Sequence, residues 1–228
     1  MTTIKLEPKL TPANKKLITN DWAERFPEFK VYRPMWLLRR TGPLVVGICL
    51  DRTSGNDQYR PTFHVHCLAR PWDGISLTLD QGLKTIRSGT TESINVRFHY
   101  DHVDEAAQRL KDQVKFPMCG TWNLGDVVAA YHNYMTVPGG MDHYILYEDI
   151  VSYYTWCDKR DKALIILDEF MPTLRSWKHV ALMEGGPDAW YAKCRKIIES
   201  TDVRQIVEDE VIRHKLTKVP DEGFDCSE

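Results

Sequence analysis

The 228-residue sequence predicts an α+β fold: an N-terminal helix, an antiparallel β-meander of about five strands, and a C-terminal helical half packed on it. Two observations support this. Between residues 29 and 100, apolar and polar residues alternate in segments separated by short turn sequences. From residue 103 onward, apolar residues recur at helical spacing. Because the connections are short, we expect a single domain over residues 1–228, with a β-rich half (1–103) and a helical half (104–228).

The first helix is predicted to begin at Thr11-Pro12. A threonine hydroxyl accepts hydrogen bonds from early backbone N–H groups, and proline suits the first helical position. Apolar residues then recur at helical spacing up to Pro27, namely Leu17, Ile18, Trp22 and Phe26.

Five segments carry the strand pattern, and short breaks between them favour antiparallel pairing. They are residues 29–40, 44–51, 62–70, 75–79 and 93–100. The segment Leu44–Leu50 is apolar on both faces, which predicts a central strand covered on both sides. Gly47 within it would permit a close approach of a neighbouring group.

Six helices are predicted in the second half, each after a turn or a capping residue. They are residues 105–114 after Asp104, residues 125–135, a helix from Asp142 to Cys157, residues 162–171 ending or kinking at Pro172, and helices beginning at Pro187-Asp188 and Ser200-Thr-Asp202. The Gly-rich break Val137-Pro-Gly-Gly140 separates two of them. The segment after Pro220 is acidic, and we expect it to be frayed.

Composition narrows the class of protein. The longest apolar run, Pro43–Leu50, is far shorter than a membrane span, and the first residues lack the apolar region of a secretory signal. Six cysteines without a Cys-x-x-Cys motif predict reduced thiols in a cytoplasmic protein rather than a disulfide framework. We interpret Cys49, Cys67, Cys157 and Cys194 as packing residues.

The most suggestive polar constellation lies in two of the predicted strands. His64 and His66 alternate with apolar residues and so share one strand face, and His99 takes the corresponding place in the strand 93–100. If these strands are neighbours, the three imidazoles would fit one Zn or Fe ion and support a metal-dependent hydrolase. The alternatives are a small-ligand site and, without any cofactor, a solvated sheet face.

Charge is unevenly distributed along the chain. Residues 1–103 carry 15 Lys/Arg against 10 Asp/Glu, whereas residues 104–228 carry 15 against 22. A basic half can face a polyanion, so a nucleic-acid-binding protein using Arg39, Arg70 and Arg97 is a second alternative. The excess is modest, and attraction between the two halves explains it equally well.

Motifs of several enzyme classes are missing. Ala163–Glu169 resembles a Walker B strand, but no phosphate-binding Gly-x-x-x-x-Gly-Lys-Ser/Thr loop accompanies it. The sequence also contains no Gly-x-Ser-x-Gly and no His-Glu-x-x-His. We therefore lean towards a protein that is not an enzyme.

Aromatic residues concentrate between Tyr131 and Trp156, where six of the ten tyrosines lie. Tyrosine and tryptophan are favoured at protein interfaces. The leading hypothesis is a non-enzymatic cytoplasmic protein that binds another protein through this aromatic-rich helical surface; a homo-oligomer also stays open. The predicted binding residues are Tyr131, Tyr134, Tyr144, Tyr153, Trp156 and Arg97. Acidic residues Glu208, Asp209 and Glu210 would steer a basic partner.

Overall fold

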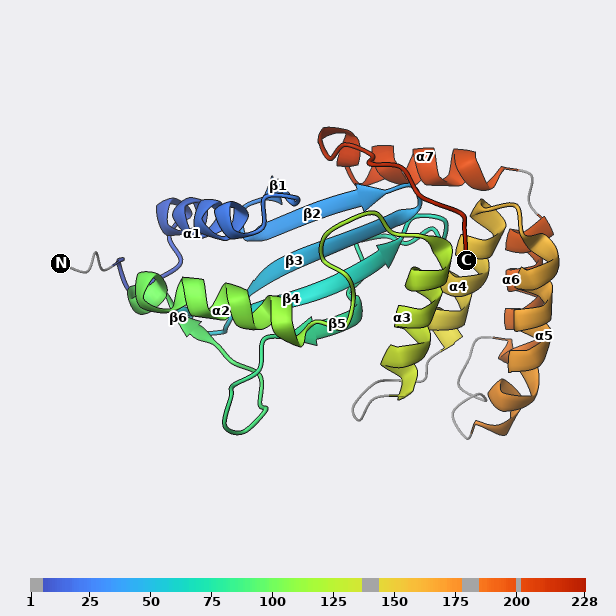
Figure 1. Cartoon of the computed structure of the whole chain (residues 1–228), viewed down its shortest axis with the longest axis horizontal. Coiled ribbons are helices and arrows are strands. Elements are labelled where there is room, and N and C mark those ends of the chain that lie inside the picture. The colour runs from blue at the N-terminus through green and yellow to red at the C-terminus, as the bar shows by residue number, and fades with distance from the viewer. Residues whose placement is uncertain (1–5, 137–143, 178–184, 200–201) are drawn as a thin grey trace.

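The computed structural model describes residues 6–136, 144–177, 185–199 and 202–228, and it has the predicted α+β architecture (Figure 1). The strands are β1 (Lys30–Arg33), β2 (Trp36–Thr41), β3 (Leu44–Arg52), β4 (Gln58–Cys67), β5 (Thr78–Gly82) and β6 (Ile94–Asn95). The helices are α1 (Pro12–Arg25), α2 (His99–Gln113), α3 (Leu124–Thr136), α4 (Tyr144–Trp156), α5 (Arg160–Ser176), α6 (Gly186–Glu199) and α7 (Val203–Arg213). Short 3-10 turns span Val96–Phe98 and Leu216–Lys218.

The sheet is an antiparallel meander in the order β1-β2-β3-β4-β5, and β6 pairs with the start of β4. The predicted strand over residues 29–40 is in fact a hairpin, because Met35 takes a left-handed φ of 69° between β1 and β2. The prediction for β3 is confirmed: it is central, and Leu44–Leu50 are buried throughout. Gly47 faces His64, and a Cβ at Gly47 would lie 2.3 Å from the imidazole Nε2.

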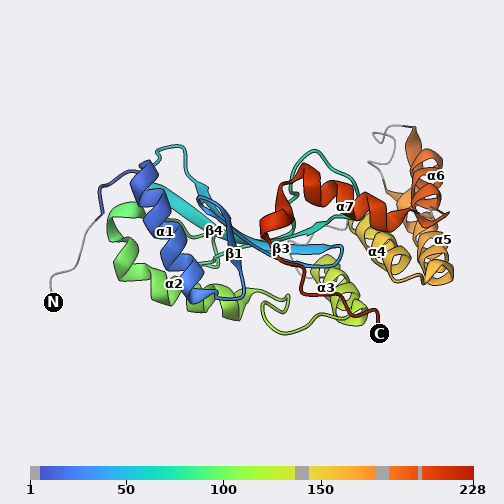
Figure 2. The same ribbon diagram turned by 90° about the horizontal axis from the view of Figure 1, so that it is seen from above.

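The molecule is elongated, with the sheet in its middle (Figures 1 and 2). Helices α1 and α2 lie together at one end, and α3 to α6 gather at the other. Trp22 of α1 and His99 of α2 both contact Tyr59, so these helices cover one sheet face. His214, just after α7, packs edge-on against His66, which lies on the opposite face. The central strands are thus covered on both faces.

Two further local predictions are wrong. The strand expected over residues 93–100 ends at Asn95, whose side chain accepts a hydrogen bond from the Arg97 N–H and so starts a turn instead of continuing the ladder. Helix α2 then begins at His99, ahead of the predicted start. Of the two outcomes expected at Pro172, an end of the helix is excluded because α5 continues to Ser176, and a kink stays a prediction. The proposed cap Asp142, the break at 137–140 and residues 200–201 lie outside the described residues.

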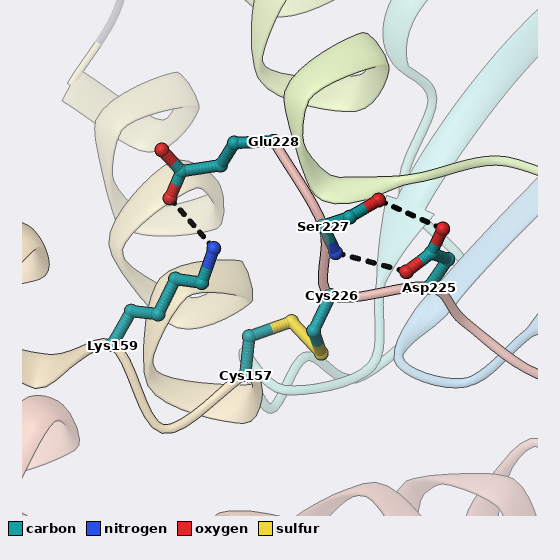
Figure 3. The surroundings of a disulfide bond; sticks show 6 residues. All are labelled: Cys157, Lys159, Asp225, Cys226, Ser227 and Glu228. Atoms are coloured by element: carbon teal, nitrogen blue, oxygen red, sulfur yellow. Dashed lines mark hydrogen bonds and ion pairs between the residues drawn. A yellow bond between two sulfur atoms is a disulfide. The ribbon is translucent and has the colours of Figure 1, made fainter.

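The segment after Pro220 is ordered, contrary to the expectation of a frayed tail, because its acidic residues find basic partners. Asp221 lies 2.8 Å from Arg40, and Phe224 stacks on the Tyr153 ring. Cys226 forms a disulfide with Cys157 at the end of α4 (Figure 3).

The prediction of six reduced thiols is therefore wrong for Cys157 and Cys226, because the fold brings together two cysteines 69 residues apart. Cys49, Cys67 and Cys194 are buried free thiols, as predicted, and Cys119 is exposed.

Candidate functional site

The predicted aromatic surface is largely interior. Tyr131 and Tyr153 are fully buried, and their hydroxyl oxygens lie 3.1 Å apart. The Tyr131 hydroxyl donates to the buried carboxylate of Asp149 at 2.9 Å. Both rings support the packing of α3 against α4, so neither is accessible to a partner in this fold.

The remaining predicted binding residues are dispersed. Tyr144 packs edge-on against Trp190, and Trp156 lies under the guanidinium of Arg204 at 4.4 Å. Arg97 is exposed, but its turn lies between β6 and α2, at the end of the sheet away from α4 (Figure 1). Of this set, only Tyr134 borders the cleft described below.

The structure does not bring the three histidines together. His64 and His66 share one face of β4, whereas His99 Nδ1 bonds to the Tyr59 hydroxyl on the other face, at 2.7 Å. His99 Nε2 in turn lies 2.9 Å from an Asp21 oxygen. Among the residues the structure describes, no group of three His, Cys, Asp or Glu side chains is arranged to hold a metal ion.

Two of the three arginines expected to contact a polyanion are buried and paired with carboxylates of the protein itself. Arg39 is buried, donates to Glu222 at 2.6 Å and lies over the Trp122 ring. Arg70 is also buried and is ion-paired with Asp149. A phosphate backbone would therefore meet only Arg97 of this set.

A cleft of about 290 Å³ lies beside β5 and the facing ends of α3 and α4. Its walls are mainly apolar and aromatic, formed by Trp72, Leu77, Leu79, Tyr134, Ile145 and Leu146. Trp72 and Leu77 keep 49% and 41% of their surface exposed and line the same cleft, so their apolar surface is grouped rather than scattered. An apolar concavity with exposed aromatic surface is typical of a binding site.

A bulge in β5 shapes one wall of this cleft. Between its pairings with Phe63 and Val65, β5 contains an extra residue, and Leu79 there takes a left-handed φ of 51°. A branched side chain in this conformation costs about 1–3 kcal/mol and persists only where the surroundings impose it. Bulges of this kind re-aim side chains beside functional sites.

A buried ion pair lies at the inner end of the cleft. Arg70 Nε is 2.5 Å from Asp149, and Glu148 is 4.0 Å away. Burial acts to lower the pKa of Arg70, but the Asp149 carboxylate outweighs it and leaves that pKa raised. Burial also raises the pKa of Asp149. Arg70 lines the cleft, and its buried Nη2 has no hydrogen-bond partner within the part of the chain that the structure describes.

Ser76 connects the cleft to His66. The Ser76 backbone N–H donates to His66 Nδ1 at 3.1 Å, so that nitrogen is an acceptor and the neutral imidazole carries its proton on Nε2. Ser76 Oγ lies 2.8 Å from the same Nδ1, and Thr78 Oγ1 lies 3.1 Å from Ser76 Oγ. Burial lowers the pKa of His66 well below its ordinary value, so the imidazole is neutral at pH 7.

A serine hydroxyl beside an imidazole is also the geometry of a nucleophile and its general base. Here, the base is weak, because burial opposes the imidazolium form and none of the described carboxylates bonds to His66 Nε2 to stabilise it. The arrangement is therefore better suited to hydrogen bonding than to proton transfer.

The cleft residues were missed from the sequence for identifiable reasons. Pro71-Trp-Asp-Gly74 has the composition of a turn, and only the tryptophan within it signals unusual surface. Arg70 meets Asp149 only through packing across 79 residues, which no local pattern encodes.

No protein family model, no curated protein and no solved structure matches this chain. The fold defines an α+β protein with an antiparallel meander, and none of its described helices has the length and apolarity to cross a membrane. A function therefore has to come from the chemistry of its own side chains.

Proposed function

We propose that the protein binds another protein, without catalysing a reaction, and that the cleft beside β5 is its binding site. The observation that carries this proposal is the exposed pair Trp72 and Leu77 on the rim of an apolar cavity. Tryptophan anchors at the centre of an interface commonly supply most of its binding energy. Tyr134, one of the residues predicted from the sequence, contributes to the same wall.

Binding is favoured over hydrolysis because the polar groups at and behind the cleft are poor catalysts, and two of them have hydrogen-bond donors that no described residue accepts. Among the described residues, neither Arg70 Nη2, which lines the cleft, nor His66 Nε2, whose ring lies behind Ser76, has a hydrogen-bond partner. A buried donor without an acceptor costs about 1–3 kcal/mol. A backbone carbonyl of the partner, an uncharged acceptor, would recover part of that energy if it lay within reach of Arg70 Nη2.

The predicted cytoplasmic setting is not needed for this proposal. The disulfide between Cys157 and Cys226 is of a kind that persists mainly in oxidising compartments. Measuring free thiols in protein taken directly from its source would decide between the two settings.

The test compares proteins retained from native lysate by immobilised wild type and by a Trp72→Ala/Leu77→Ser double variant. Ile165→Ser is the matched control, because Ile165 is 55% exposed on α5 and does not line the cleft. We expect one stoichiometric partner, retained by wild type and the control but lost from the double variant. Losing the Trp72 anchor should weaken binding by about 2 kcal/mol or more.

Equal retention by all three proteins would place the interface elsewhere. If purified wild type releases a small molecule that the same double variant does not carry, the cleft binds a small ligand instead of a protein. Circular dichroism of each variant would verify that the fold is intact.

A further inference from the structure

We infer that the cleft recognises a basic side chain, lysine or arginine, presented on an exposed segment of the partner protein. This inference rests on the proposed function and adds the chemistry of the partner. Its basis is the charge around the cavity, together with the shape and lining of its walls.

At the inner end of the cleft, the positive charges of the described residues are all paired. Arg70 is paired with Asp149 at 2.5 Å, and Glu148 accepts from Lys193 at 3.0 Å. These two acids and two bases cancel one another. An anion entering here would meet two buried carboxylates already present, so an acidic partner gains little from Arg70.

The mouth of the cleft, by contrast, is negative. Asp80 is the exposed charged residue among the described lining residues, and the Tyr134 hydroxyl donates to its Oδ1 at 3.3 Å. Desolvation and the nearby Asp80 raise the pKa of Tyr134 to about 12, so the hydroxyl keeps its proton and remains a donor. The carboxylate is thereby held beside an aromatic ring, where a cation can bind both.

The apolar walls suit the rest of such a side chain. Lysine and arginine bury their methylene stems along apolar surface while the charged group stays near water. Leu77, Leu79 and Ile145 supply that surface, and a cavity of about 290 Å³ accepts a side chain rather than a folded element.

Helix α7 beside the cleft carries exposed acids as well as basic residues, and Arg213 at its end is ion-paired with Glu210 at 3.1 Å. Glu210 of α7 accepts a hydrogen bond from the Trp72 backbone N–H at 3.2 Å, which ties α7 to the rim of the cleft. Glu208 and Asp209 on the same helix are exposed. Such charges raise the association rate of a basic partner more than its final affinity.

The test uses three peptides that differ only at their centre: Ac-Gly-Leu-Lys-Leu-Gly-NH2 and its Gln and Glu analogues. Each is titrated into the full-length ¹⁵N-labelled protein while the amide signals of Ser76 to Asp80 are followed by NMR. The variant is Asp80→Asn, which removes one charge with little change in shape. Asp73→Asn is the control, because Asp73 is a fully exposed acid of the preceding turn that does not line the cleft.

We expect the lysine peptide to bind most tightly, and Asp80→Asn to weaken it about threefold to fivefold. Asp73→Asn should leave its affinity within about twofold, and added salt should reduce the lysine preference. Equal binding of all three peptides at the cleft would refute recognition of a basic side chain but would leave the cleft as a binding site. Tighter binding of the glutamate peptide would refute recognition of a basic side chain and would indicate an acidic partner. No shift at millimolar peptide would count against both proposals.

Discussion

Removal of the Cys157–Cys226 disulfide should lower the free energy of unfolding substantially. The bond joins residues 69 positions apart, so it closes a long loop in the unfolded chain. The chain-entropy relation for a loop of about 70 residues gives about 4 kcal/mol at 25 °C. Measured losses for native disulfides run from about 2 to 5 kcal/mol, which brackets this value.

The assay is urea unfolding of the oxidised protein and of a Cys157→Ser/Cys226→Ser double variant, followed by far-UV circular dichroism. Cys119→Ser is the matched control, since Cys119 is an exposed free thiol. The control should change the free energy of unfolding by less than about 0.5 kcal/mol. A double variant that loses less than about 1 kcal/mol would refute the reasoning.

Hydrogen exchange can locate the effect. The backbone N–H groups of Leu124 and Gly125, at the start of α3, donate to Asp225 and Ser227 at 2.9 and 3.2 Å. If the disulfide holds this segment against α3, these two amides should exchange faster in the double variant. Unchanged protection would show that the ion pairs of the segment, such as Lys159 with Glu228 (Figure 3), hold it without the bond.

Three further predictions concern the buried polar core. Gly47→Ala should lower the free energy of unfolding in urea by about 1–3 kcal/mol, because the new Cβ would lie 2.3 Å from His64. Gly82→Ala, whose new Cβ has its nearest atom at 3.5 Å, should lower it much less, and equal losses would contradict this. Burial lowers the pKa of His64 to about 3, below its unfolded value near 6.5. The stabilising effect of the neutral His64 is therefore complete above pH 6.5 and decreases as pH falls towards 3. From pH 6.5 to 5, the free energy of unfolding should fall less steeply in His64→Gln than in wild type, and parallel slopes would contradict this. Asp149→Asn should lower the free energy of unfolding by about 3–5 kcal/mol, because it leaves the buried charge of Arg70 poorly compensated, and a loss below about 1 kcal/mol would show that Glu148 takes over.

The architecture was predictable where a single period runs through a segment. Residues 44–50 are apolar on both strand faces, and this pattern correctly predicted a central strand. The segment 93–100 kept an apparent alternation through a 3-10 turn, so it resembled a strand although only Ile94 and Asn95 pair. The first hairpin was missed because its turn uses Met35 with a positive φ instead of the usual glycine or asparagine.

The candidate site was much less predictable, since its chemistry depends on pairings between distant residues. Tyr131 and Tyr153 suggested an interface, but their hydroxyls are satisfied within the fold by each other and by Asp149. Cys157 and Cys226 share no recognisable spacing. In each case, the decisive partner lies far along the chain, beyond the reach of periodicity or composition.

The ion pairs between β2 and the segment after Pro220 have a consequence for biosynthesis. Arg40 pairs with Asp221, 181 residues later, and Arg39 pairs with Glu222. At translation rates of about 5–20 residues per second, roughly 10–40 s separate the synthesis of these partners. Throughout that interval, the nascent chain carries an early strand whose two arginines lack their native carboxylates. A ribosome-bound chain is therefore expected to remain incompletely folded, and open to chaperones, until Asp221 and Glu222 leave the exit tunnel.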